Sequence, residues 1–558
     1  MHVQKTTSRQ VVTRELNCFS AVEVVRKTSD HQLRHSPLLD RLVPKGGKYG
    51  YDLIAHVGVQ TFLEGRTLGD IAADLRPQRI PFSSLHDLGM KFLYYFGHLH
   101  QQYAAPQLRD WFQQRAWSTW LIDATVEPGT PAYFGVLDAE SGLCLKAWKI
   151  ATENTDDIVL CLREATEQFG KPNELLHDLG DAMANACEAV WGAAVVHRAC
   201  HFHLLRDIGE DLYAKPQAAL RELIRKLKLQ PRLKEQRRGQ SLWLRDHVKD
   251  PTSLVRLLQE EAVEVPADVL GRELVVAVHQ WILDYPSDGH RQGYPFDPYL
   301  LYLHRRVNRA ATILEPLLDG TAVHHRMPQV LGNLLKMLQD YLNDERVIKA
   351  AGEFEHAWQL FTRLRTAMQL SSQGGSPLHN PYPLEAEQNA AIRHSLEALR
   401  EEFRSQADNC TEPSDARQYE IIVKHLDRYW SMLFSTTSRE RTTNGLESHW
   451  GKVKRCCRKR HGRKKLTRDF QCLPPEIMLI PNLRNPQYVE RVLGDLSELP
   501  AKLALVGRSA PPWTQWRNRQ KPRTIGRLPQ CLLRQEDLID RLAAIYETQC
   551  QREEAQTA

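Results

Sequence analysis

The spacing of apolar and polar residues changes along the chain, and the sharpest change lies between residues 117 and 205. Short apolar runs of strand length are mixed there with runs of helical period. The predicted order is three strands, a helix, a strand, a helix and a strand. The apolar parts of these elements are Trp120–Thr125, Tyr133–Leu137, Leu143–Ile150, Ile158–Phe169, Leu175–His177, Ala182–Val190 and Ala194–His197. A hairpin meander followed by alternating helices and strands predicts a mixed sheet with helices on its faces.

The segment before this sheet, residues 49–112, has a helical pattern. It predicts a helix from Leu53 to near Gly65, a second helix capped by Thr67, and a third capped by serine at about Ser84. Asp70 stands at the capping-box position of the second helix. A short helix, a tight turn and another helix are typical of a helix-turn-helix, although three ordinary packed helices give the same pattern.

The remaining segments, on either side of these two, are mostly helical in pattern. Residues 206–438 contain almost no strand pattern and many amphipathic runs, which predicts an all-helical insertion. Residues 439–495 begin with a helix and continue with a more apolar stretch. The tail, 496–558, predicts one more amphipathic helix around 535–545. Periodicity is weak in residues 1–48, to which we assign no function.

Length and composition limit the possible classes of protein. A chain of 558 residues is too long for one ordinary core, so we expect three or more units. No run approaches the roughly 18 apolar residues of a membrane span, and the polar start lacks the apolar part of a secretory signal. Eleven scattered cysteines favour free thiols in a reducing compartment. We therefore expect a cytoplasmic protein.

The formal net charge, +6, is small, but cations are concentrated in one short stretch. No acidic residue lies between Glu447 and Asp469. The cations of this basic run are Lys452, Lys454, Arg455, Arg458, Lys459, Arg460, Arg463, Lys464, Lys465 and Arg468. A solvated helix face or a nuclear-localisation-like cluster is the ordinary interpretation. The density of the run favours contacts with the phosphates of a nucleic acid, which carry no base specificity by themselves.

Asp123 is the first candidate site residue, because it interrupts the apolar strand 120–125. A buried carboxylate costs several kcal/mol unless it is paired or binds a cation. The alternative is a structural aspartate bonded to backbone or to an arginine. The apolar surroundings favour a role in chemistry.

Asp178 is the second candidate, since it ends the fourth predicted strand. Ligands of open α/β sheets gather outside the strand ends. The alternative role is the N-cap of the next helix. Asp181 suits that cap better, which leaves Asp178 free for a metal ion.

Glu447 is the third candidate. The alternative role is a capping box, with Asn444 as N-cap and Glu447 three residues later. Against it, Glu447 shares one helix face with Gly451, Lys454 and Arg458 at spacings of four, seven and eleven residues. A carboxylate followed by cations on one face suits a phosphodiester backbone. Trp450 beside it could stack on a base or pack in the core.

Two aspartates and one glutamate from different elements of one sheet are suited to metal-dependent phosphoryl transfer. Mg²⁺ prefers oxygen ligands and keeps several of its waters, and Mn²⁺ is a possible substitute. A pair of such ions can activate an attacking hydroxyl and stabilise the leaving oxygen of an in-line displacement.

Three segments together resemble one known group of proteins. They are 121–125 with Asp123, 177–181 followed by 200–206, and 441–447 with its cationic helix. The chain resembles the DDE transposases of the ribonuclease H-like fold, and is most similar to the bacterial insertion-sequence and Mutator-like group. In that group a helical insertion separates the second aspartate from the glutamate. The resemblance covers roughly 120–206 and 440–490.

The resemblance implies a function and partners. The activity would be metal-dependent cleavage of double-stranded DNA at transposon ends and strand transfer into target DNA by the freed 3′ hydroxyl. Residues 49–112 would supply DNA recognition, and the protein would form a homo-oligomer on DNA at the nucleoid. The group has Asp-Gly or a similar pair at the second aspartate. Leu179, Gly180 and Asp181 follow Asp178 here, so either aspartate could be the second ligand.

Cys200 and His203 match a Cys-x-x-His pair that lies near the active site in the same group. The pair is half of a zinc site, but structural zinc needs four ligands and no partner pair stands at ligand spacing. We therefore expect a packed cysteine and a histidine that bonds nearby backbone or DNA.

Two rival functions share the same sequence features. One is a non-enzymatic DNA-binding protein derived from a transposase, and the other is a nuclease on the same fold. The complete set Asp123, Asp178 and Glu447 favours the transposase. Strand-transfer products would separate it from the nuclease.

Overall fold

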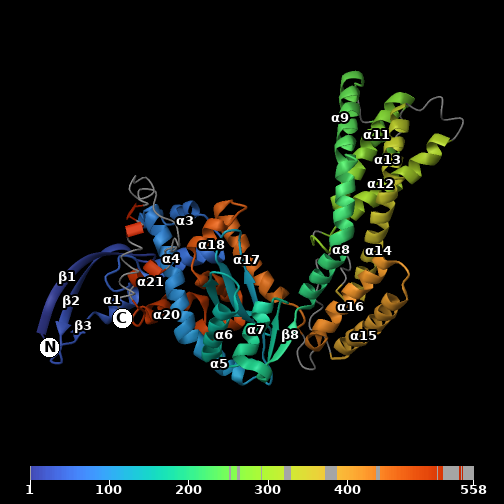
Figure 1. The fold of residues 1–558 in the computed structure, drawn as a ribbon. Helices are drawn as coiled ribbons and strands as arrows, with labels where there is room; N and C mark the ends of the chain where they lie inside the picture. Colours follow the sequence, from blue (N-terminus) through green and yellow to red (C-terminus); the bar gives the residue numbers. More distant parts are fainter. Residues whose placement is uncertain are drawn as a thin grey trace.

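The computed structural model describes residues 2–249, 253–260, 264–290, 292–319, 329–370, 386–434, 440–511 and 513–519, with 540–541 and 543–544. Figure 1 shows a strand ribbon at the N-terminal end, a central α/β body and a long helical body on its other side. The helix predicted around 535–545 falls almost wholly outside the described residues. In the part of the chain that is described, no helix is long and apolar enough to cross a membrane.

The central body contains the predicted mixed sheet. Its strand order is β6-β5-β4-β7-β8. The first three strands run antiparallel, and β7 and β8 run parallel to β4 and to each other. The strands are β4 (Thr119–Thr125), β5 (Ala132–Asp138), β6 (Leu143–Ile150), β7 (Glu174–His177) and β8 (Val196–Ala199). All five strands predicted from the apolar runs are confirmed, with the last displaced by two residues.

Helices cover both faces of this sheet. On one face, the ring of Trp120 meets that of Trp191 on α7 (Asp181–Trp191) edge to face at 6.2 Å. Trp148 of β6 donates to Glu164 of α6 (Thr155–Phe169) on the same face, at 2.6 Å. The long helix α17 (Asn444–His461) packs on β4 and β5. The predicted arrangement, a mixed sheet with helices on both faces, is therefore confirmed.

Described residues between 206 and 434 are helical wherever they are regular, as predicted. The helices are α8 (His201–Lys226), α9 (Leu229–His247), α10 (Ser253–Leu258), α11 (Ala267–Leu283), η5 (Tyr285–Asp288), α12 (Tyr299–Asp319), α13 (Gln329–Leu342), α14 (Glu345–Ala367), α15 (Ala386–Asn409) and α16 (Pro413–Leu433). They enclose a hydrophobic core separate from that of the sheet, around residues such as Leu212, Phe354 and Leu364. The helical body projects from the β8 side of the sheet (Figure 1).

One buried arginine fastens the two ends of this insertion to the sheet. Arg198 of β8 is 1% exposed and donates to the carboxylate of Glu174 on β7 at 2.9 Å. It also donates to the carbonyl oxygens of Leu433 at 3.0 Å and Glu440 at 2.8 Å, where the chain returns. His201, the first residue of α8, lies 2.7 Å from the same Leu433 oxygen. The residues at which the chain leaves the sheet for the helical body and comes back from it are therefore hydrogen-bonded to each other.

Residues 1–48, for which the sequence predicted nothing, form a small sheet. It consists of β1 (His2–Thr13), β2 (Asn17–Lys27) and β3 (Leu33–Arg34), followed by α1 (Pro37–Leu42). Most residues of both long strands are exposed, so apolar alternation is weak there. In Figure 1 this ribbon extends away from the central body.

The helices of 49–112 form as predicted, with one wrong cap. They are α2 (Tyr51–Gly58), η1 (Val59–Leu63), α3 (Leu68–Asp74), η2 (Arg76–Gln78), α4 (Phe82–Leu99), η3 (His100–Ala104) and α5 (Ala105–Gln113). Thr67 and Asp70 form the predicted capping box of α3. The predicted serine cap of α4 is wrong, because Pro81 is its N-cap and the helix already begins at Phe82.

This helical region shares one hydrophobic core with the sheet and with the C-terminal segment. Buried His100 lies 2.7 Å from the carbonyl oxygen of Leu145 on β6 and 3.0 Å from the hydroxyl of Tyr488. The C-terminal elements are α18 (Thr467–Cys472), η6 (Pro475–Arg484), α19 (Pro486–Tyr488), η7 (Val489–Leu493), η8 (Leu496–Glu498), α20 (Leu499–Val506) and α21 (Trp513–Arg519). Asn482 exchanges two hydrogen bonds with the backbone of Cys144, which covers the edge of β6.

We predict that Arg198→Met destabilises the protein by about 3–5 kcal/mol, because it leaves Glu174 buried without its cation. Thermal unfolding monitored by circular dichroism measures the loss. Adding Glu174→Leu should recover part of it, since an apolar pair carries no buried charge. An Arg198→Met variant as stable as the wild type would contradict this role.

Candidate active site

Asp123 lies on the face of the sheet that α17 covers. It stands opposite Gly135 in the β4–β5 register, and a Cβ built on Gly135 would lie 2.3 Å from the ring of Trp450 on α17. Gly445 at the start of α17 packs on Leu121, two residues before Asp123. Trp450 is 3% exposed, so it packs in the core. Close packing against a glycine thus places α17 directly over Asp123.

The Asp123 carboxylate is buried in a negative environment. It is 8% exposed and accepts a hydrogen bond from the Ala124 amide at 2.8 Å. Burial, together with the charges of Glu447 and Asp178, raises the pKa of Asp123 to about 7, although His203 opposes this shift. Among the described residues, it forms no ion pair with lysine or arginine, so of the two partners in the predicted structural alternative, backbone and arginine, only the backbone one is present. A bound cation would relieve this accumulation of negative charge.

Asp178 directly follows β7, at the same level as Asp123 on the neighbouring strand β4. Strands β4 and β7 are parallel, with Leu121 opposite Leu176, and each aspartate follows its leucine by two residues. Neighbouring strands are about 4.8 Å apart. Asp178 accepts a hydrogen bond from the Gly180 amide at 3.0 Å, which holds its carboxylate in the turn after β7.

Asp181 has a different role from the one the sequence suggested. Gly180 is the N-cap of α7, and Asp181 is the first residue of the helix, so the predicted cap is wrong. Its side chain is 79% exposed and pairs with Arg428 of α16 at 3.0 Å. Asp181 therefore links the sheet to the helical body, which leaves Asp178 as the aspartate beside Asp123.

Glu447 reaches the site from α17. Thr443 is the N-cap and Asn444 the first helical residue, so Glu447 stands one position beyond a capping box and the predicted alternative is wrong. One of its carboxylate oxygens, Oε1, lies 3.5 Å from Nε2 of His203 on α8. The glutamate is held by a histidine from another element.

Cys200 and His203 complete the contact between α8 and α17. The Thr443 amide donates to the sulfur of Cys200 at 3.3 Å, and the Thr443 hydroxyl lies 3.4 Å from Nδ1 of His203. Burial lowers the pKa of His203, but its hydrogen bond with Cys200 and the charges of Asp123 and Glu447 outweigh this and raise it to about 9. Cys200 is packed as expected, whereas His203 faces a carboxylate instead of backbone.

The three candidate metal ligands are carboxylates, so they offer oxygen atoms, but these atoms do not surround one point. Across the described part of the chain, no three histidine, cysteine, aspartate or glutamate side chains lie close enough to hold one metal ion. Carboxylate oxygens are the ligands that Mg²⁺ prefers. Asp123, Asp178 and Glu447 match this ion in donor type, and their carboxylates would have to move together to hold it.

The basic run divides into structural and free cations. Arg460 and Asp469, each 7% exposed at the side chain, pair at 2.8 Å, so this cation is buried in an ion pair and its DNA contact stays a prediction. Lys454 and Arg458 lie 3.5 and 3.9 Å from Glu127, a neighbour that the sequence did not suggest. Lys459 donates to the Glu64 carbonyl oxygen at 3.0 Å. The exposed cations that form no ion pair with any described residue are Lys452, Arg455, Lys459, Arg463, Lys464, Lys465 and Arg468.

The sequence matches no protein-family profile, and no curated protein matches it. The function has to be argued from the geometry of this site.

We predict that Gly135→Ala disturbs the site without changing any of its polar groups. The added methyl would collide with Trp450, and overpacking of this kind costs about 1–3 kcal/mol. Thermal unfolding and tryptophan fluorescence would show the loss of stability and the shift of α17. Gly352→Ala on α14 is the matched control, because a Cβ there meets open space. Equal stability of the two variants would contradict the close packing of α17.

Proposed function

We propose that this chain is a DDE-type transposase whose catalytic sheet has the ribonuclease H-like fold. The strand order β6-β5-β4-β7-β8, with three antiparallel strands and two parallel ones, supports that fold. The helical insertion between β8 and α17 supports the transposase group that the sequence resembles.

One observation carries the proposal above the others. The helix α17 packs on β4, which bears Asp123, and its Glu447 lies 3.5 Å from His203. Thr443 and His203 are 240 residues apart in sequence, yet they are in contact. Acidic residues from three distant segments thus lie at one end of one sheet, and metal-dependent strand cleavage needs such carboxylates around its ions.

Each side chain of the site has a role in this proposal. Asp123, Asp178 and Glu447 would hold Mg²⁺, which when bound activates the attacking hydroxyl and stabilises the leaving oxygen. Asp123 provides a rigid ligand because β4 is central and paired on both sides. His203 positions the Glu447 carboxylate and balances part of the negative charge while no substrate is present.

The DNA would be held by surfaces on either side of the site. Exposed cations at 463–465 follow α17 and suit the phosphates of duplex DNA. The exposed start of α4, with the turn after α3, would recognise the transposon ends in the manner of a helix-turn-helix. Since α4 is part of the common core, this region is best tested by substitution of exposed residues rather than by deletion.

We predict that Asp123→Asn, Asp178→Asn and Glu447→Gln each reduce cleavage by at least about a hundredfold, because each removes a charge from the proposed metal site. The measurement is nicking, with Mg²⁺, of a labelled duplex carrying the element's own inverted repeats. DNA affinity should change less than twofold.

Asp181→Asn is the matched control and should keep cleavage near the wild-type level. The opposite result, with Asp181 required and Asp178 dispensable, would make Asp181 the second ligand. Cleavage without joined products would identify a nuclease, and binding without cleavage by the wild type would favour the non-enzymatic DNA-binding protein.

We predict that replacing Lys464 and Lys465 with alanine weakens binding to the native ends and to random DNA alike. Each lost phosphate contact lowers the slope of log affinity against log salt by about 0.9. Fluorescence anisotropy over a range of salt concentrations measures this slope. A change confined to the native ends would mean that these lysines read sequence.

A further inference from the structure

A groove between α8 and α16 remains unexplained by the proposed catalytic site. Its volume is about 720 Å³, and it lies near the base of the helical body. Pro216 of α8 and Ile421 of α16 contribute apolar lining. The cations that line it are Lys215, Arg417, Lys424 and Arg428.

The cations of α16 form a straight row. Arg417, Lys424 and Arg428 are spaced by seven and four residues, which places them on one face of the helix. The row is about 17 Å long at a rise of 1.5 Å per residue. Lys215 faces the same groove from α8.

The charge of the groove is mostly uncompensated. Arg417, Lys424 and Lys215 form no ion pair with any residue that the structure describes. Two carboxylates, Asp211 and Glu353, line the groove beside the four cations, and Asp211 lies 2.9 Å from the imidazole of His425. Arg428 pairs with Asp181, but both side chains are exposed, so this pair is weak. A surplus of positive charge therefore faces the groove.

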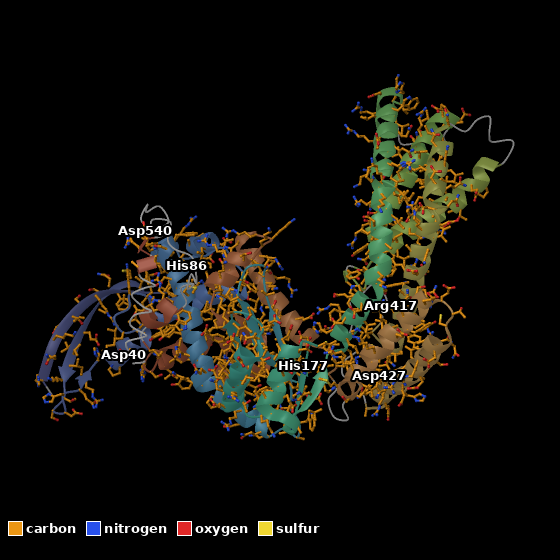
Figure 2. The ribbon with its side chains drawn as sticks, viewed as in Figure 1. Asp40, His86, His177, Arg417, Asp427 and Asp540 are labelled. Carbon is orange, nitrogen blue, oxygen red and sulfur yellow. The ribbon has the colours of Figure 1, made fainter. Side chains whose placement is uncertain are left out.

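The groove leads to the proposed catalytic site from two directions. Arg428, at one end of the row, touches Asp181, three residues after Asp178. The helix α8, which carries His203 in the site, carries Lys215 twelve residues later, at about 18 Å along its axis. Figure 2 shows Arg417 on the helical body and His177, at the end of β7, in the part of the sheet nearer to the helical body.

We propose that this groove binds the sugar–phosphate backbone of duplex DNA as the strand runs from the catalytic site along the helical body. The inference rests on the proposed function and adds a phosphate-binding surface to it. A row of about 17 Å corresponds to the rise of roughly five base pairs at 3.4 Å each along the duplex axis. A free phosphate would be bound by cations that converge on one point, whereas these cations are spread along a line.

The test compares two double variants of the full chain that lose the same charge. Arg417→Ala with Lys424→Ala removes two cations of the groove. Lys234→Ala with Arg238→Ala removes one exposed lysine and one exposed arginine from α9, farther out on the helical body (Figure 1). Fluorescence anisotropy with a 30-base-pair duplex, without divalent metal, gives affinity and its salt dependence.

The groove variant should bind about thirtyfold more weakly at 0.15 M salt, and its salt slope should fall by about 1.8, as expected for two lost phosphate contacts. The control variant should change less than twofold. Arg417→Gln with Lys424→Gln, which keeps most of each side-chain stem, should repeat the result and excludes a folding defect when its melting temperature is unchanged.

Other results would overturn the inference in distinguishable ways. Equal binding by the groove variant and the control would remove the groove while leaving the proposed function intact. Saturable binding of pyrophosphate that the groove variant loses, with DNA affinity unchanged, would assign the groove to a free anion. A wild-type protein that binds no DNA would overturn both the groove and the proposed function.

Discussion

The arrangement of the whole molecule depends on the buried Arg198 guanidinium. It neutralises Glu174 between two strands and also donates to the carbonyl oxygens of Leu433 and Glu440, where the chain returns from the helical body. A buried ion pair contributes little net stability by itself, because desolvation offsets the attraction. The hydrogen bonds that Arg198 donates fix the position of the returning chain instead. With the return point fixed beside β8, the next helix can start only over the sheet, and Glu447 is delivered to Asp123.

The same constraint explains the balance of charge in the candidate site. Packing of α17 through Gly135 and Gly445 brings its glutamate towards an aspartate that burial already disfavours as an anion. The charge of His203, whose position is fixed by Cys200 and Thr443, reduces the repulsion between these carboxylates. The side chains of the site are therefore held in place although negative charge is in excess. An excess of negative charge is what a proposed metal-binding centre requires.

Local patterns predicted the sheet and the three carboxylates, since strands of the core are apolar and Asp123 interrupts one of them. They failed where contacts between distant residues decide the outcome. In the N-terminal sheet, where apolar periodicity is weak, Val22 and Val24 are 67% and 43% exposed, while Glu23 is 8% exposed and accepts a hydrogen bond from the Ser36 amide. Likewise, nothing in the basic run distinguishes Arg460, paired with Asp469, from its exposed neighbours. Such pairings become visible only in three dimensions.

The continuous helix α8 has a mechanical consequence. It begins beside the candidate site and spans 26 residues, about 39 Å, into the helical body. Proline within a helix removes one backbone hydrogen bond and makes that point the easiest to bend. Pro216 lies in the middle of α8 and in the wall of the cationic groove. Bending of α8 would therefore be easiest at the groove, and it would change the position of the outer helices relative to His203.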